Sequence, residues 1–152
     1  MRQENQSVQL SSFRVGEEVY AIDIMRIREI INPVPVTPVP ESIGAIEGVI
    51  NLRGVILPII DLRKRFGLTA LTDSRLVKYI IALVDGRLFG FRVDEVLDVV
   101  RVDTEKISPS PQHEMGREPG LFVGVCQVKD RLLLLLDLRK IIRPHERERG
   151  AT

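Results

Sequence analysis

Several residue types that carry chemistry are scarce in this chain. Its 152 residues include one cysteine, two histidines and no tryptophan, and aromatic residues make up only 5%. The single cysteine, Cys126, excludes an internal disulfide and lies where a strand would bury a small hydrophobic residue. His113 and His145 have no partners at metal-site spacing, so we expect no metal site. Few aromatic rings also leave a poor stacking platform for nucleic acid.

The chain also lacks an excess of one charge and a long hydrophobic run. Twenty-two Lys and Arg against twenty-one Asp and Glu give a net charge of +1, so no overall field attracts nucleic acid or an anionic membrane. No apolar run approaches the ~20 residues of a membrane helix, and the opening MRQENQSVQL is no signal peptide. We therefore expect a cytoplasmic protein without membrane insertion. Its 44% hydrophobic content predicts a globular domain with a real core.

An internal repeat is the strongest feature of the sequence. GVINLRGVILPIIDLRK at 48–64 and GVCQVKDRLLLLLDLRK at 124–140 share seven of seventeen residues at an offset of 76. VGEEVYAIDIMRIREI at 15–30 aligns with VDGRLFGFRVDEVLDV at 84–99 at an offset of 69, and TPVPE at 37–41 aligns with SPSPQ at an offset of 71. Two small insertions in the second copy explain the growing offset, the later one in the polar stretch QHEMGREPG. A unit of about seventy residues is therefore duplicated.

Turn signals divide each copy into short strands. Runs rich in Val, Ile, Leu, Phe and Tyr are separated by dipeptides that predict β-hairpins, namely Gly16-Glu17, Arg53-Gly54, Asp85-Gly86 and Lys129-Asp130. Four or five strands per copy suffice for a small closed barrel without exposed edges. We predict an all-β fold of two barrels, the first mainly at 13–67 and the second mainly at 77–140, and strand exchange between them is left open. Residues 1–7 and 145–152 are expected to be flexible tails.

Each copy ends with the tetrapeptide Asp-Leu-Arg-Lys. Asp61 and Asp137 can cap a short helix, and Gly67 would end the first of these helices. The preceding runs VILPII and LLLLL show no polar alternation, which is typical of strands covered on both faces. We expect these strands to lie at the contact between the barrels.

No arrangement of residues indicates catalysis. Candidate nucleophiles lack an obvious partner base, and NLRG lacks the spacing of a nucleotide-binding fingerprint. We interpret Asp23, Asp94, Glu95 and Asp98 as solvated surface charges, and we expect no catalytic residue. A nucleic-acid-binding small barrel and a small hydrolase remain as alternatives. Salt-dependent oligonucleotide binding would favour the first and turnover of generic esters the second.

Two charged residues point instead to an interaction surface. Arg53 lies at a predicted hairpin tip, where folding does not require a guanidinium. It is either a contact residue or an arginine that is only solvated in the turn, and the second interpretation is the simpler one. Glu29 lies between the apolar residues of the IREI segment. A polar residue inside an apolar rim indicates a contact site or an internal ion pair. We predict an ion pair between Glu29 and Arg53.

The segments VGEEVYAIDIMRIREI, VTPVP and GVINLRGVILPIIDLRKRFG together resemble the CheW family of bacterial chemotaxis coupling proteins. The resemblance extends from about Val8 to Ile142. It implies a single CheW-like domain over 1–152, with two five-stranded SH3-like barrels packed on a shared hydrophobic core, short helices, no cofactor and no catalysis. One departure is that Ile43 and Ala45 stand where the family usually carries a proline and an aromatic residue.

The resemblance also implies a role and partners. It implies a non-enzymatic adaptor that couples the cytoplasmic tips of methyl-accepting chemoreceptors to the regulatory domain of the histidine kinase CheA, recruited to membrane receptor arrays. A CheW-like scaffold of a non-flagellar pathway is the alternative. The receptor-facing groove implied by the motifs comprises Ile27, Glu29, Ile30, Gly48, Asn51, Arg53 and Gly54. Weaker second-barrel partner contacts are implied at Leu88, Phe89, Gly90 and Val93.

Overall fold

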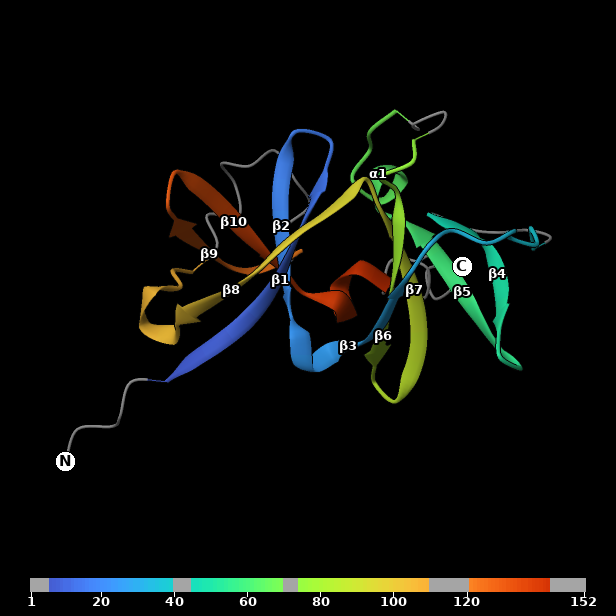
Figure 1. Cartoon of the computed structure of the whole chain (residues 1–152), viewed down its shortest axis with the longest axis horizontal. Coiled ribbons are helices and arrows are strands. Elements are labelled where there is room, and N and C mark those ends of the chain that lie inside the picture. The colour runs from blue at the N-terminus through green and yellow to red at the C-terminus, as the bar shows by residue number, and fades with distance from the viewer. Residues whose placement is uncertain (1–5, 40–44, 70–73, 110–120, 143–152) are drawn as a thin grey trace, which may run out of the picture.

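A computed structural model describes residues 6–39, 45–69, 74–109 and 121–142. Strands dominate this part of the chain (Figure 1). In chain order they are β1 (Ser7–Val15), β2 (Glu18–Asp23), β3 (Ile27–Ile31), β4 (Ile46–Leu52), β5 (Val55–Asp61), β6 (Lys78–Val84), β7 (Arg87–Val93), β8 (Glu95–Asp103), β9 (Phe122–Val128) and β10 (Arg131–Leu136). Short helical segments are η1 (Ile24–Arg26), α1 (Leu62–Arg65), η2 (Thr104–Lys106) and a turn over 138–142. No helix within these ranges is long and apolar enough to cross a membrane.

The strands form two five-stranded sheets, which confirms the predicted all-β fold. The first sheet has the order β8-β1-β2-β10-β9 and the second has the order β3-β6-β7-β5-β4. Thr37, which follows β3, pairs with Val49 of β4, and Ser108, which follows β8, pairs with Val125 of β9. The last strand of each sheet thus bonds to the segment that continues its first strand. Each sheet is therefore closed into a small barrel.

Each sheet combines strands from both copies of the repeat. The first sheet joins β1 and β2 to β8, β9 and β10, whereas the second joins β6 and β7 to β3, β4 and β5. Neither sheet is therefore confined to 13–67 or to 77–140, because the first two strands of each copy pair within the sheet of the other copy. Figure 1 shows the chain crossing between the two sheets after β2 and again after β7.

The duplication extends to the hydrogen-bond register. The parallel pair of β10 with β2 aligns Leu135 with Ala21, and the parallel pair of β5 with β7 aligns Ile59 with Gly90. These residues are related by the same offsets, 76 and 69, that align the two copies in the sequence. The sequence repeat is therefore also a repeat of backbone pairing.

The glycine that begins each repeated GV segment is required where the barrels close. A Cβ atom at Gly124 would lie 2.7 Å from Cγ2 of Ile107 and 2.8 Å from the carbonyl oxygen of Ser108. A Cβ atom at Gly48 would collide with the carbonyl oxygen of Thr37. Both glycines are buried, so a larger residue would push apart the two segments that close each barrel.

A hydrophobic core shared by the two sheets holds them together. It includes Phe13 and Tyr20 from the first sheet and Ile80 and Phe91 from the second, each at most 2% exposed. The Tyr20 ring stacks on Phe66, which follows α1, with 4.8 Å between the ring centroids. Smaller clusters fill the interior of each barrel. Because the core belongs to both sheets, the two barrels are packed as one body.

A buried carboxylate adds a polar connection between the sheets. Asp94, between β7 and β8, is only 4% exposed, whereas the sequence analysis expects a solvated charge there. Its carboxylate accepts hydrogen bonds from Nε of Arg63, at 3.0 and 3.1 Å, and from the backbone N–H of Gly16, at 2.8 Å. Gly16 lies in the β1–β2 turn and Arg63 lies in α1, which follows the second sheet's β5. Asp94 therefore bonds to both sheets at once.

Candidate functional site

The β4–β5 hairpin presents Arg53 at its tip in an unusual backbone conformation. Arg53 and Gly54 have φ angles of +51° and +89°, the pattern of a type I′ turn. The N–H of Gly54 donates to Oδ1 of Asn51 at 2.8 Å and fixes the turn. Glycine or asparagine is the preferred residue at position 53 of such a turn, and a left-handed conformation costs other residues about 1 kcal/mol. Turn geometry therefore does not explain the arginine.

The guanidinium of Arg53 reaches the β3 strand. Its Nη2 donates to Oε2 of Glu29, so the structure contains the ion pair that the sequence analysis predicts. The Arg53 side chain is 69% exposed and the Glu29 side chain 32% exposed. An ion pair at such exposure contributes between about 0 and 1 kcal/mol to stability. Its main effect is to hold the guanidinium in one direction at the surface.

Exposed apolar side chains lie on the same two segments as this ion pair. Ile30 of β3 is 40% exposed, and Val55 and Ile56 of β5 are 47% and 61% exposed. Ile56 lies opposite the exposed Asn51 in the β4–β5 register. We call the set Glu29, Ile30, Asn51, Arg53, Gly54, Val55 and Ile56 the Glu29–Arg53 surface. Apolar area with one oriented charge pair is typical of a protein–protein contact.

Two of the predicted groove residues, Gly48 and Ile27, lie outside this surface. Gly48 is buried against Thr37, where it closes the barrel. Ile27 is half-buried and packs against the shared core. Val55 and Ile56, by contrast, are surface residues that the sequence analysis missed. The uninterrupted VILPII run suggested burial on both faces, but it begins at the exposed end of the hairpin.

The predicted second-barrel contacts on β7 are mostly interior. Phe89 is 8% exposed and Val93 is fully buried in the shared core, and a Cβ atom at Gly90 would collide with Ile59. Only Leu88 is half-exposed. β7 lies between β6 and β5, in the same sheet as β3 and β4. The side chains of Phe89 and Val93 therefore face the shared core.

The titratable groups with shifted pKa values are buried side chains. Burial raises the pKa of the Cys126 thiol above its ordinary value, which agrees with the predicted small hydrophobic role. Burial, and then the nearby Glu47 carboxylate, raises the pKa of Tyr79. No group of three or more His, Cys, Asp or Glu is placed to hold a metal ion among the described residues. His113, His145 and Ile43 lie outside those residues, and Ala45 is buried in the shared core.

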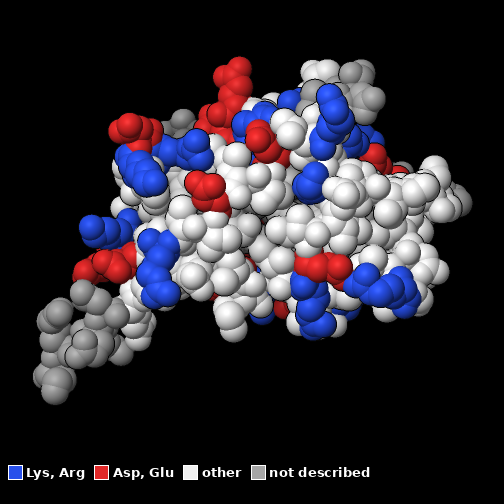
Figure 2. Space-filling model, in the orientation of Figure 1, with Lys and Arg blue, Asp and Glu red and all other residues white. Residues whose placement is uncertain are grey.

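Charged residues are dispersed on the face shown in Figure 2. Small groups of Lys and Arg alternate with Asp and Glu, and no continuous basic area crosses this face. Strong nucleic-acid binding requires a basic groove or stripe. This face gives the nucleic-acid alternative no support.

Comparisons with known proteins agree on one family. A family model described as CheW-like domain matches residues 9–146. Chemotaxis protein CheW of Rhizobium meliloti (strain 1021) is 36% identical over 140 residues, which cover 92% of this chain and 90% of that protein. Chemotaxis protein CheW of Helicobacter pylori (strain ATCC 700392 / 26695) is 33% identical over 143 residues, covering 93% and 86%.

A solved structure extends this similarity to the fold. The crystal structure of scaffolding protein TtCheW from Thermoanaerobacter tengcongensis superimposes with a TM-score of 0.84 and 32% sequence identity. The superposition covers 90% of this chain and 92% of the other. The sequence matched by the family model includes both copies of the repeat and all strands of both sheets, apart from the first two residues of β1. The chain therefore belongs to the CheW-like family.

Proposed function

We propose that this chain is a non-enzymatic adaptor that couples chemoreceptors to the histidine kinase CheA in bacterial chemotaxis signalling. Family membership supports the proposal, since the relatives described above are named chemotaxis protein CheW and the structural neighbour is named a scaffolding protein. The observation that carries it is the Glu29–Arg53 surface, where an arginine that the turn does not require pairs with Glu29 and exposed apolar residues lie on the same strand and hairpin. The place of action is the cytoplasmic side of membrane receptor arrays.

The receptor contact in this proposal uses the Glu29–Arg53 surface. Glu29 occupies one side of the Arg53 guanidinium and leaves its remaining N–H groups for carboxylate or carbonyl oxygens of a receptor tip. Ile30 of β3 and Ile56 of β5 are exposed apolar residues on the same strand and hairpin. A pre-oriented guanidinium loses less side-chain entropy on binding than a free one. The affinity therefore depends on the ion pair as well as on the apolar contacts.

Coupling to the kinase in this proposal requires only a rigid body with two interfaces. The shared core and the Asp94 bonds tie the sheets together, so a partner on one barrel has a fixed position relative to a partner on the other. Coupling between two binding sites is typically about 1–3 kcal/mol, which such contacts can transmit. The regulatory domain of CheA is the proposed second partner, and the output is flagellar or belongs to another chemosensory pathway.

Arg53→Ala tests the receptor contact. We expect the variant to remain folded, because an exposed pair is lost, and to bind receptor roughly tenfold or more weakly, since a charge-assisted contact contributes about 1.5–3 kcal/mol. The assay is co-sedimentation with receptor-containing vesicles, together with receptor-dependent activity of added CheA. Lys129→Ala is the matched control, because Lys129 has the equivalent left-handed hairpin position in the second copy, at φ +57°. Unchanged receptor binding by Arg53→Ala, or equal loss in the control, would contradict the assignment.

A further inference from the structure

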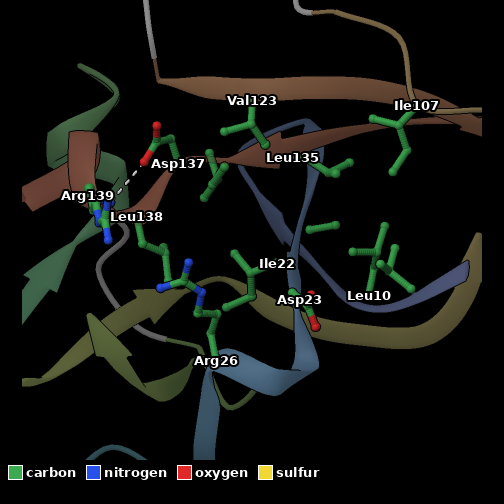
Figure 3. Close-up of a pocket in the computed structure, with 13 residues that line it drawn as sticks. Leu10, Ile22, Asp23, Arg26, Ile107, Val123, Leu135, Asp137, Leu138 and Arg139 are labelled. Atoms are coloured by element: carbon green, nitrogen blue, oxygen red, sulfur yellow. Dashed lines mark hydrogen bonds between the residues drawn. The ribbon is translucent and has the colours of Figure 1, made fainter. Parts of the chain in front are cut away.

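Two arginines in the helical turns combine a fixed backbone with an ion pair. Asp61 accepts the N–H of Arg63 at 2.9 Å, and Asp137 accepts the N–H of Arg139 at 3.1 Å. Figure 3 shows the second of these bonds as a dashed line. The two guanidinium groups pair with carboxylates on other segments, at 3.0 and 2.8 Å respectively. In both places a short side chain holds the backbone from which the arginine extends.

Asn51 fixes the backbone beside Arg53 in the same way. Its Oδ1 accepts the N–H of Gly54 at 2.8 Å, and the Arg53 guanidinium pairs with Glu29 on β3. The hydrogen bond that closes a β-turn joins the two residues on either side of the tip, so it does not use the N–H of Gly54. The Asn51 side chain therefore adds a bond that the turn itself does not supply.

The β6–β7 hairpin shows that this type of turn does not require the amide. Asp85 and Gly86 have φ angles of +52° and +79°, the same pattern as at the β4–β5 tip. The residue that corresponds to Asn51 in this hairpin is Leu83, whose side chain cannot accept a hydrogen bond. Aspartate adopts the left-handed conformation more readily than arginine does. The extra bond thus occurs in the hairpin whose tip residue is less suited to its conformation.

The corresponding hairpin of the second copy lacks both the bond and the ion pair. Gln127 stands at the position of Asn51, and its Nε2 donates to the carbonyl oxygen of Lys129 at 3.4 Å instead of accepting an N–H. Lys129 and Asp98 stand at the positions of the arginine and the glutamate, and no ion pair joins these two described residues. The short acceptor and the held cation therefore occur together in one copy and are both missing from the other.

We propose that Asn51 is a positioning residue of the Glu29–Arg53 surface, which directs the Arg53 guanidinium toward a receptor without contacting the receptor itself. This inference rests on the proposed function. The bond from Gly54 to Asn51 offsets the unfavourable left-handed conformation of Arg53, because the two free energies are of similar magnitude. Without this bond the tip adopts further conformations, and the guanidinium leaves Glu29 for part of the time. Binding must then restrict a mobile side chain, which lowers the affinity.

The test is a double-mutant cycle in co-sedimentation with receptor-containing vesicles. We expect Asn51→Ala to bind roughly three- to tenfold more weakly, the effect of one hydrogen bond. In an Arg53→Ala background the same change should have no further effect, because Asn51 acts only through the guanidinium. A direct receptor contact by Asn51 would give the same fold loss in both backgrounds, and that result would overturn the proposal.

Two conservative variants separate the acceptor from the amide. Asn51→Gln keeps the amide on a longer side chain, which in the second copy reaches a carbonyl group, so we expect a loss of receptor binding similar to that of Asn51→Ala. Asn51→Asp keeps a short acceptor and should preserve slow hydrogen exchange of the Gly54 amide. The matched control is Gln127→Ala, which should bind receptor normally. Unchanged receptor binding by Asn51→Gln, or fast exchange at Gly54 in Asn51→Asp, would overturn the proposal.

A measurement without receptor distinguishes this inference from the proposed function. The heteronuclear NOE of the Arg53 Nε–H group reports the mobility of the side chain, and we expect it to fall in Asn51→Ala and in Glu29→Ala. Thermal unfolding checks that each variant is folded. An unchanged NOE in Asn51→Ala would overturn the positioning role, whatever the receptor result. A lower NOE together with normal receptor binding by Arg53→Ala would support the positioning role and contradict the proposed function.

Discussion

Replacing Asp94 by asparagine is expected to destabilise the whole fold. The carboxylate accepts three hydrogen bonds, two from Nε of Arg63 and one from the N–H of Gly16, and its side chain is 5% exposed. Asparagine has nearly the same shape, but its NH₂ group would face donors, and the Arg63 guanidinium would lose its counter-charge. The Arg63 side chain is 19% exposed, so it stays largely desolvated after the change.

The expected loss follows from those contacts. Breaking a buried ion pair by removing one partner costs about 3–5 kcal/mol, and hydration of the partly exposed Arg63 reduces this to about 2–4 kcal/mol. For a domain of this length, each 1 kcal/mol lowers the melting temperature by about 2–4 °C, so a decrease of about 4–16 °C is expected.

The measurement is urea and thermal unfolding followed by circular dichroism. Asp98→Asn is the control, because Asp98 is exposed and its hydrogen bonds with Ser12 involve only its backbone N–H and C=O. The Asp98 variant should unfold within about 0.5 kcal/mol of the parent protein. If Asp94→Asn is no less stable than Asp98→Asn, the carboxylate does not connect the two sheets energetically.

Three further outcomes are expected. Gly124→Ala should lower the free energy of unfolding by about 1–3 kcal/mol, because its Cβ atom would meet Ile107 and Ser108. The control Gly54→Ala has open space around it and should lose only about 1 kcal/mol. Equal losses of the two variants in urea titrations would refute the requirement for glycine where the barrel closes. Glu29→Arg should weaken receptor binding in vesicle co-sedimentation with little change in stability, and unaltered affinity would argue against the receptor contact. Burial raises the pKa of the Cys126 thiol above 9.0, so the folded protein keeps this proton at a pH where the unfolded chain releases it. The free energy of unfolding should therefore keep this contribution below pH 9.0 and lose it above that pH. A Cys126→Ala variant whose free energy of unfolding falls equally above pH 9.0 would contradict this.

The local structure follows directly from the sequence, because turn chemistry determines it. The Arg53-Gly54 and Asp85-Gly86 dipeptides predict hairpins, and both occur with positive φ at each residue. Asp61 and Asp137 accept N–H bonds at the start of helical turns, as predicted. These features depend only on residues close together in the chain.

The sheet to which each strand belongs could not be predicted in this way. β2 pairs with β10 in the same register in which β7 pairs with β5. The sequence alone therefore does not tell whether β2 pairs with β10 or with the equivalent strand β5 of its own copy. The burial of Asp94 has a similar cause, because Arg63 and Gly16 converge on it from 31 and 78 positions away. The Glu29–Arg53 pair was predictable because an isolated charge within an apolar motif is itself visible in the sequence.

The exchange of strands between the two sheets has a consequence for how the chain folds. β1 and β2 need β10, which emerges more than one hundred residues later, before their sheet can form. The second sheet, by contrast, comprises β3 to β7, which are consecutive in the chain, so its barrel can close before β8 is made. Pairing at such sequence separation is slow, so the first barrel is expected to close only after synthesis is almost finished, on a second barrel that is able to form earlier.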